Sequence, residues 1–548
     1  MAPLFAVAVV AFAAGVVTGT GPGRAERHLV TQYMTDWAHG NYAQMYRLLD
    51  SASRSRISEF DFASAYRSAA STATLTAVVP GQVGSRQGDL LPVPVRVRTS
   101  LFGILRETLL VPLSGSGSDA RVRFSDDLLF PGLRSGERLT RQVALAPRAE
   151  LLAQNGIPLA QGPNRSSPIP DVAAEVTGSL GPIPPEQAAT YAAAGYPPDA
   201  KVGLNGLERV FQQQLAGTPG GTLLAGSRPL ARTVPGSGLP VTTTIDPTIE
   251  RAAITAIAGR YAGIAAMDPR TGELLALAGV AFSALQPPGS TMKIITATGA
   301  LEAGIVKLSD TFPVLTGAPV DGVTVSNANG EACGGTFVQA FADSCNSVFA
   351  PLGAKLGAAR LVNIAERFGF NHPVGIPGAA ESLIPSASTI GDALAVGSSA
   401  IGQGTVQTTA LQMTDVAATI AMGGKRPIPI LQLHQAPHFI RVTTRHIAHL
   451  VQQLMVAVVA YGTGTAAQIK GVVVAGKTGT AELRNTQGPD AGPNAGSAAN
   501  TDAWFVGYAP VGHPQIVVGA LFPEQGAGGA TAAPAVHDVL VAALHHHS

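Results

Sequence analysis

The sequence predicts a multidomain α+β protein, and three observations lead to that class. The chain has 548 residues, which exceeds one compact domain and corresponds to three or four domains of about 150 residues. Hydrophobic residues make up 46% and charged residues 13%, so the chain can bury large cores and is not of the disordered class. Helical and strand-like hydrophobic patterns both occur, and the composition shifts near residues 141 and 240.

The chain starts with an apolar segment over residues 1–23. Residues 2–23 carry no charge, and the first charged residue is Arg24. Such a run can just span a bilayer or serve as the apolar part of a signal peptide, although no basic segment precedes it. A buried core helix is the alternative. We expect a single-pass anchor in the cell membrane, with the catalytic part on the extracytoplasmic side.

Residues 24–140 are predicted to form a small α+β domain. Apolar residues recur at helical spacing from Val30 to Trp37, and Ser58 precedes a second helical pattern as a candidate cap. Residues 91–97 and 107–111 alternate as strands do. We expect helices on a curved sheet; the aromatic residues that we place in its core, in preference to a ligand pocket, are Trp37, Tyr42 and Tyr46.

Residues 141–240 are rich in Pro, Gly and Ala, which predicts an extended, loop-rich module, with residues 216–240 as a linker. After residue 241 the chain becomes apolar and helix-rich. Strands are expected at residues 264–267 and 273–277. This last stretch is long enough for one catalytic domain.

The charge balance and the cysteines exclude several classes of protein. Lys and Arg number 36 and Asp and Glu 35, so the net charge of +1 gives no basis for a nucleic-acid partner. Cys333 and Cys345 cannot build a disulfide scaffold or a four-cysteine zinc site; in an exported protein they can pair, and buried free thiols are equally plausible. No zinc-binding spacing occurs, so we expect no metal and no cofactor.

Ser290 and Lys293 are the first candidates for chemistry. They lie three residues apart at the start of an apolar run through Leu301, and that spacing places both on one face of a helix. A serine hydroxyl becomes nucleophilic when a base takes its proton, and a lysine whose pKa is lowered can be that base. Among the seven lysines, only Lys293 follows a serine by three residues. A capping serine before a surface lysine gives the same spacing, so this motif alone is weak.

Two further motifs strengthen the case. Ser344, Cys345 and Asn346 form a Ser-x-Asn element, and residues 472–480 are predicted to be a β-branched strand that runs into Lys477-Thr478-Gly479-Thr480. Glycine lets a backbone approach a substrate closely, while Lys and Thr side chains suit a carboxylate. Ser-x-x-Lys, Ser-x-Asn and Lys-Thr-Gly in this order are the signature of class A β-lactamases and penicillin-binding proteins.

The chain resembles the high-molecular-mass class B penicillin-binding proteins over nearly its whole length. The segments similar to their transpeptidase domain are residues 244–246, 267–273, 399–404 and 503–510. Residues 206–221 are similar to their non-catalytic pedestal, often called the dimerisation domain. Residues 37–66 resemble the NTF2-like amino-terminal domain of the methicillin-resistance type.

The resemblance implies a division into four parts. These are the anchor or signal segment (1–23), an NTF2-like α+β domain (24–140), the extended pedestal with its linker (141–240) and a serine transpeptidase domain (241–548). The last is expected to have a β-lactamase-like fold, an antiparallel sheet flanked by helices.

The resemblance also implies a mechanism. Ser290 attacks the penultimate D-Ala carbonyl of a peptidoglycan stem peptide, Lys293 takes the serine proton, and Ser344 relays a proton to the departing D-Ala. The implied positioning and binding groups are Asn346, which orients Lys293, Lys477, which supplies positive potential, and Thr478, Gly479 and Thr480, which hold the terminal carboxylate. β-Lactams acylate the same serine, and a membrane glycosyltransferase is the expected partner.

Two rival functions share these motifs. The first is hydrolysis by a β-lactamase or D,D-carboxypeptidase, but a class A β-lactamase needs a glutamate to activate water, and Glu381-Ser382-Leu383 is a poor match for its segment. The second is a non-enzymatic β-lactam sensor or scaffold. Intact Ser290, Lys293 and Lys477 favour an enzyme over a scaffold.

Overall fold

The computed structural model describes residues 23–483 and 497–546. The anchor predicted over residues 1–23 lies outside the described residues, apart from Gly23. Within the described ranges no single helix has the length and apolarity needed to cross a bilayer; one pair of helices, bent by 99°, passes by length and composition only. The chain divides into two compact units, which we describe separately.

The first unit comprises residues up to 149, 180–202 and 213–239. Its helices are α1 (Arg24–Ala38), α2 (Tyr42–Arg47), α3 (Ser51–Arg56), α4 (Glu59–Thr72) and α6 (Ala188–Ala193). Its strands are β1 (Leu75–Pro80), β2 (Leu90–Thr99), β3 (Gly103–Ser114), β4 (Arg121–Val122), β5 (Leu139–Ala144), β8 (Leu180–Pro182), β10 (Gly220–Ala225) and β11 (Arg228–Thr233). Strand β9 (Lys201–Gly203) and helix α8 (Gln212–Ala216) lie where the chain passes between units.

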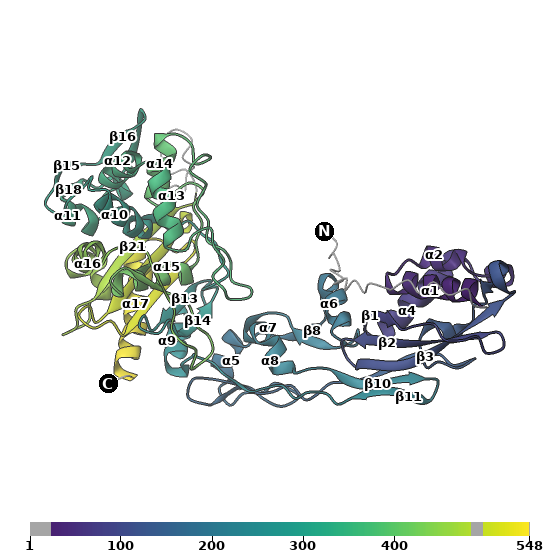
Figure 1. The fold of residues 1–548 in the computed structure, drawn as a ribbon. Coiled ribbons are helices and arrows are strands. Elements are labelled where there is room, and N and C mark those ends of the chain that lie inside the picture. The colour runs from purple at the N-terminus through teal and green to yellow at the C-terminus, as the bar shows by residue number, and fades with distance from the viewer. Residues whose placement is uncertain (1–22, 484–496, 547–548) are drawn as a thin grey trace. The chain divides into compact units, whose positions relative to one another are not determined.

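Helices α1 to α4 pack on a four-stranded antiparallel sheet in the order β1-β2-β3-β4 (Figure 1). Ser58 caps α4 as expected, since its hydroxyl accepts from Asp61 N at 3.1 Å. The hydroxyls of Tyr33 and Tyr66 are bonded at 2.7 Å inside the core. Trp37 is buried there as predicted, whereas Tyr42 and Tyr46 are only partly buried at its edge.

The linker expected over residues 216–240 instead contains a β-hairpin. Strands β10 and β11 pair with each other, and β10 also pairs with β5. Gly226, with φ +58°, and Ser227 form the turn between the two strands. A Gly-Ser pair between strands is a hairpin signal, and the high glycine content of the segment obscured it.

The second unit comprises residues 150–179, 203–212 and 240–548. Its helices are α5 (Pro170–Val176), α7 (Gly206–Val210), α9 (Pro247–Ile257), α10 (Lys293–Glu302), α11 (Phe337–Ala342), α12 (Asn346–Leu356), α13 (Ala358–Arg367), α14 (Ala393–Ala400), α15 (Ala410–Ala421), α16 (Arg445–Ala460) and α17 (Gly528–His546). Its strands are β6 (Leu151–Leu152), β7 (Pro158–Ala160), β12 (Val241–Thr242), β13 (Gly263–Met267), β14 (Leu274–Gly279), β15 (Thr311–Leu315), β16 (Gly317–Val320), β17 (Val323–Ser326), β18 (Cys333–Thr336), β19 (Lys425–Pro427), β20 (Phe439–Arg441), β21 (Ala475–Glu482), β22 (Thr501–Ala509) and β23 (Ile516–Phe522).

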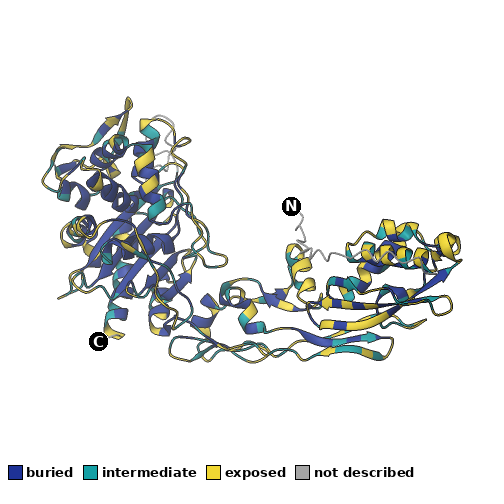
Figure 2. Ribbon diagram, in the orientation of Figure 1, coloured by how far each residue is buried: buried dark blue, intermediate teal, exposed yellow. Residues whose placement is uncertain are grey.

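A five-stranded antiparallel sheet in the order β14-β13-β23-β22-β21 forms the centre of this unit. Successive strand residues point to opposite faces. Val518 and Ala520 of β23 pack with α9 and α17, whereas Gly519 between them faces Thr414 of α15. The strands are therefore buried on both faces, which explains their continuous apolar runs (Figure 2).

Helices α10 to α14 and two small two-stranded sheets, β15–β18 and β16–β17, form a second layer beside the sheet. Every residue from Thr291 to Leu301 is buried, so α10 runs through the interior of the unit (Figure 2). The predicted class, a multidomain α+β protein whose catalytic domain has an antiparallel sheet flanked by helices, is confirmed. Strand β21 is an edge strand of the sheet, which leaves one of its sides free of sheet pairing among the described residues.

Candidate active site

Ser290 lies in a 3₁₀ turn, Gly289–Met292, that leads directly into α10. The turn rests against the edge strand: a Cβ added to Gly289, whose φ is +51°, would lie 2.7 Å from Thr480 O. Gly289 N also donates to Gly402 O at 2.9 Å. Because Ser290 is partly exposed while the residues after it are buried, its hydroxyl is accessible to a substrate at the N-terminal end of α10.

Lys293 follows one turn later and is fully buried. Its Nζ donates to Ser344 O at 2.6 Å and to Asn346 Oδ1 at 2.7 Å, and it lies 3.2 Å from Ser344 Oγ. The Phe349 ring centroid lies 5.6 Å from Nζ. Burial, and then the positive charge of Lys477, lower the pKa of Lys293 well below its usual range. A lysine held this way carries the free lone pair that a general base needs.

The Ser344 hydroxyl lies between two amines. Lys477 Nζ donates to Ser344 Oγ at 2.9 Å, and Lys293 Nζ lies 3.2 Å from the same oxygen. The backbone at Ser344 has φ +62°, the left-handed region that favours glycine. This strained turn at the end of α11 directs both the carbonyl and the hydroxyl of Ser344 toward Lys293, as sites that hold strain for function often do.

Replacing Ser344 with glycine separates the strain from the hydroxyl. In Ser344→Gly we expect the free energy of unfolding to change by less than about 1 kcal/mol. Glycine removes the backbone strain at positive φ, and this gain offsets the conformational entropy that glycine adds to the unfolded chain. Acylation by benzylpenicillin should slow by about 100-fold, since the proton relay is gone. Ser344→Ala, the control, should be equally slow but less stable. Acylation of Ser344→Gly at the wild-type rate would contradict the relay.

Asn346 begins α12 and is held from both sides. Its Oδ1 accepts from Lys293, and its Nδ2 donates to Ser326 O at 3.0 Å. The neighbouring Ser347 N donates to Asn327 Oδ1 at 2.8 Å. The Ser-x-Asn element is thus fixed by the last residue of β17 and the residue that follows it, and the Asn346 amide in turn fixes the position of the Lys293 amine.

Lys477 lies on β21, fully buried, with Nζ 3.0 Å from Thr478 O. Strand β21 starts at Ala475, so the preceding valines are not part of it, contrary to the sequence prediction. Burial lowers the pKa of Lys477 to about 7, opposed by the negative charge of Asp343. Its charge therefore changes near neutral pH.

That titration gives a testable pH profile. A lysine with a pKa of about 7 is cationic below pH 7 and neutral above it. We expect kcat/KM for a carboxylate-bearing acyl donor to fall as pH rises above about 7, because the free enzyme loses the charge that attracts the carboxylate. In Lys477→Arg the guanidinium stays charged, so the alkaline fall should disappear even if the maximal rate is lower. If kcat/KM of Lys477→Arg fell above pH 7 as it does in the wild type, the fall would be due to a group other than Lys477.

The three residues after Lys477 lie along the edge strand. The Thr478 and Thr463 hydroxyls lie 2.5 Å apart, and Thr480 Oγ1 accepts from Gly528 N at 3.3 Å. A Cβ added to Gly479 would lie 2.8 Å from Pro288 O, so glycine allows the strand to lie against the turn that carries Ser290.

Cys333 and Cys345 form a disulfide, which resolves the two alternatives left by the sequence. The bond ties β18 to the residue between Ser344 and Asn346. It therefore restrains the loop that carries Ser344 and Asn346, the hydrogen-bond partners of the Lys293 amine.

The structure brings together Ser344, Asn346, Lys293 and Lys477 through direct hydrogen bonds, and Gly289 places Ser290 beside Thr480. Sequence reasoning missed Thr463, Asp343 and the Ser326 carbonyl, because each acts through a contact between distant parts of the chain. Over residues 23–483 and 497–546 no group of three or more His, Cys, Asp or Glu side chains is placed to hold a metal ion.

Three family models match the chain in succession. They are an NTF2-like N-terminal transpeptidase domain over residues 25–137, a penicillin-binding protein dimerisation domain over 137–227, and a penicillin-binding protein transpeptidase domain over 262–541. Together they account for most of the chain.

Named relatives and solved structures agree with these models. The peptidoglycan D,D-transpeptidase PbpA of Mycolicibacterium smegmatis is 31% identical over 447 residues, which is 69% of this chain and 84% of that protein. PbpA of Mycobacterium tuberculosis is 34% identical over 294 residues, 48% of this chain and 56% of that protein.

Two structures share the fold. The D,D-transpeptidase domain of a peptidoglycan glycosyltransferase from Eggerthella lenta has a TM-score of 0.60 and 28% identity, covering 74% of this chain and 100% of that one. The penicillin G acyl-enzyme complex of penicillin-binding protein A from M. tuberculosis has a TM-score of 0.57 and 26% identity, covering 73% and 100%.

Proposed function

The chain belongs to the penicillin-binding proteins with a transpeptidase domain, and on that basis we propose that it cross-links peptidoglycan through an acyl-enzyme on Ser290. The resemblance drawn from the sequence motifs, including the NTF2-like and dimerisation domains, is confirmed. The chain is a serine-type peptidoglycan D,D-transpeptidase of class B. The roles of its individual residues are our proposal.

One observation carries those roles: the buried amine of Lys293, with a lowered pKa, lies one helical turn after Ser290 and is bonded to Ser344 and Asn346. Lys293 Nζ takes the proton of Ser290 Oγ as that oxygen attacks the carbonyl carbon of the penultimate D-Ala. A new Oγ–C bond forms. The backbone N–H groups of Ser290 and Thr480 stabilise the oxyanion, an effect of about 3 kcal/mol for one donor.

The leaving group departs through Ser344. Its hydroxyl lies within hydrogen-bond distance of both amines, so it passes a proton from Lys293 to the nitrogen of the terminal D-Ala as the peptide C–N bond breaks. Lys477 draws the terminal carboxylate toward the edge strand by its charge. The Thr478 and Thr480 hydroxyls and the backbone at Gly479 hold that carboxylate against β21.

Deacylation forms the cross-link. An amine of a neighbouring stem peptide attacks the acyl carbon, the Oγ–C bond breaks, and an amide forms. The proton of the amine returns to Ser290 Oγ through Lys293. A β-lactam enters by the same first step, but its leaving group stays tethered to the acyl group and hinders the acceptor.

Membrane anchoring, the extracytoplasmic location and a glycosyltransferase partner belong to the same proposal. The uncharged stretch over residues 2–23 supports the anchor. The NTF2-like and dimerisation models match residues 25–227, and in this proposal a separate glycosyltransferase at the membrane supplies the glycan strands.

The test of the proposed function is the product formed on nascent glycan strands. The protein, together with a separate glycosyltransferase and lipid-linked precursor, should yield cross-linked muropeptide dimers on digestion and mass spectrometry. Ser290→Ala should yield only uncross-linked strands. Release of D-Ala with tetrapeptide monomers and no dimers would show a carboxypeptidase and overturn the transpeptidase assignment of this chain.

A further inference from the structure

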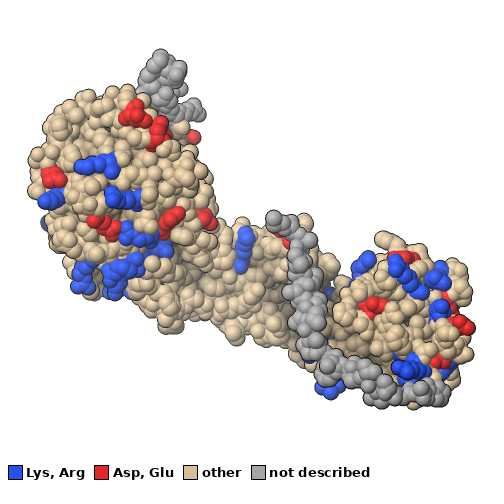
Figure 3. Space-filling model, turned by 45° about the horizontal axis from the view of Figure 1, so that its top comes forward, with Lys and Arg blue, Asp and Glu red and all other residues tan. Residues whose placement is uncertain are grey.

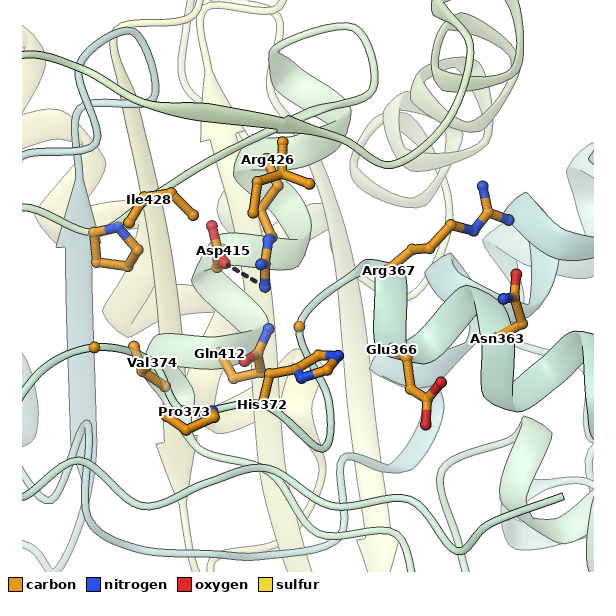
Figure 4. A pocket seen from close by; sticks show the side chains of 14 residues that line it. Asn363, Glu366, Arg367, His372, Pro373, Val374, Gln412, Asp415, Arg426 and Ile428 are labelled. Carbon is orange, nitrogen blue, oxygen red and sulfur yellow. Dashed lines mark ion pairs between the residues drawn. The ribbon is translucent and has the colours of Figure 1, made fainter. Parts of the chain in front are cut away.

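A cavity of about 660 Å³ lies in the second unit and is lined by none of the catalytic residues named above (Figure 4). It opens between α13, the segment after that helix, α15 and β19. The polar side chains that line it are Asn363, Glu366, Arg367, His372, Gln412, Asp415 and Arg426. The transpeptidase mechanism leaves this cavity without a role.

Asp415 and Arg426 form an incompletely bonded pair in this cavity. Asp415 Oδ2 and Arg426 Nη1 are 3.7 Å apart, too far for a direct hydrogen bond. Asp415 Oδ1 and Arg426 Nε are buried and, within the described ranges, have no hydrogen-bond partner. Buried polar atoms in native proteins are nearly always bonded to protein, water or a ligand, so these two atoms need polar partners that the described residues do not supply.

The position of Arg426 is fixed by its neighbours. Its guanidinium lies against Gly369, where φ is +111° and an added Cβ would overlap Nη1. Gln412 Nε2 donates to Phe368 O at 2.8 Å and so holds that glycine turn in place. Figure 4 shows the Arg426 side chain extending toward Asp415, Gln412 and His372. The pair is therefore held apart by the fold.

The arrangement specifies the chemistry of a ligand. Asp415 Oδ1 needs a hydrogen-bond donor, and the adjacent Arg426 Nε needs an acceptor. A simple cation or a simple anion would bond to one member of the pair and leave the other without a partner. An α-amino acid carries an ammonium and a carboxylate on one carbon, at a spacing that suits neighbouring partners.

We propose that this cavity binds a free α-amino acid as a zwitterion, with its ammonium on Asp415 and its carboxylate on Arg426. The remaining volume accommodates the side chain. Glu366 at the wall adds negative potential for the ammonium, whereas Arg367 is engaged by Glu302. The site lies outside the transpeptidase centre and does not depend on the reaction at Ser290.

Proton linkage gives the proposal a distinctive signature. Burial raises the pKa of Asp415 to about 8, with the charge of Arg426 opposing the shift. In the empty cavity at pH 7 the carboxyl is therefore mostly protonated, and a bound ammonium favours its ionised form. The other charged or titratable groups that face the cavity are Glu366, Arg367, His372 and Arg426. Binding at pH 7 should release protons, in His372→Gln as in the wild type.

The first test uses the unaltered full chain and needs no variant. Calorimetric titration with L-alanine and with D-alanine, in two buffers of different ionisation enthalpy, should show binding with proton release. N-Acetylalanine, which lacks the ammonium, and alaninamide, which lacks the carboxylate, should bind at least tenfold more weakly than alanine. No binding of either enantiomer, or equal binding of the truncated probes, would overturn the proposal.

Variants locate the site. Asp415→Asn and Arg426→Gln should each weaken alanine binding at least tenfold, while Asp268→Asn, which breaks the ion pair with Arg270 elsewhere, should not. D-Alanine is also the leaving group of the proposed function, so the titration is repeated on protein acylated by benzylpenicillin. Retained binding supports the cavity, and binding abolished by acylation would assign the ligand to the catalytic cleft.

Discussion

A Ser290→Ala variant is expected to form no covalent adduct with benzylpenicillin and to lose transpeptidation by about 10⁵-fold or more, the scale seen when a serine nucleophile is removed. The loss is nearly complete because the acyl-enzyme divides one difficult step into two, and alanine offers no oxygen to carry the acyl group. Intact-mass spectrometry after incubation with excess drug measures the adduct directly. Because Ser290 is partly exposed and alanine removes only its hydroxyl, the folded state should be retained.

A matched serine provides the control. Ser309→Ala changes an exposed serine outside the three catalytic motifs and should be acylated at the wild-type rate. A full adduct on Ser290→Ala would place the nucleophile elsewhere, and Ser344 would be the first alternative because its hydroxyl also lies beside two amines.

Replacing Lys293 with methionine is expected to slow acylation by about 10⁴-fold, the upper end for loss of a general base. Methionine keeps the length and apolar stem of lysine but cannot accept the proton of Ser290. The variant also leaves Ser344 O and Asn346 Oδ1 without their donor, so the relay loses its alignment. The second-order rate constant of acylation, from quenched-flow samples and mass spectrometry, measures the effect.

The free energy of unfolding of Lys293→Met shows whether its slow acylation comes from the lost base or from a disrupted fold. Two opposing effects act on the Lys293→Met fold: the cost of burying an amine disappears, and two buried acceptors lose a partner. The free energy of unfolding should therefore change by no more than about 2 kcal/mol. Lys307→Met, at an exposed lysine, is the control and should keep full activity. Wild-type acylation by Lys293→Met would remove Lys293 from the mechanism.

Charge elsewhere on the surface gives little guidance to the site. Basic and acidic residues are scattered over the face shown in Figure 3 without one dominant sign. This agrees with the net charge of +1 and explains why composition excluded nucleic acid but could not locate the cleft. The two lysines of the site are fully buried, so their effect is local.

The sequence predicted those parts of the site that lie within one motif. Ser290 and Lys293 are linked by helical periodicity, and Lys477 to Thr480 by a single strand. The left-handed backbone at Ser344 was not predictable, because serine favours other conformations and only the turn after α11 enforces it. The Thr463–Thr478 contact and the Asp415–Arg426 pair join residues that are not neighbours in the sequence, so local patterns do not contain them.

The same limit applies to the fold, because the sequence predicted strands that carry a local pattern and missed those that depend on distant pairing. Alternating runs located β2 and β3, and short continuous apolar runs located β13 and β14, since each strand carries its own pattern of burial. The hairpin β10–β11 was mistaken for a linker because its Gly-rich strand gains its stability from pairing with β5, which lies far away in the sequence. The partial burial of Tyr42 and Tyr46 likewise depends on where α2 packs.

The central claim is that Ser290 becomes acylated and that the acyl-enzyme reacts with an amine and resists hydrolysis by water. The most direct measurement is a time course of intact mass for the full chain with excess benzylpenicillin, followed by peptide mapping. We predict one adduct of the mass of the drug, mapped to Ser290 and persisting for hours after removal of free drug. Rapid clearance with consumption of the drug, or an adduct mapped to another residue, would contradict the account.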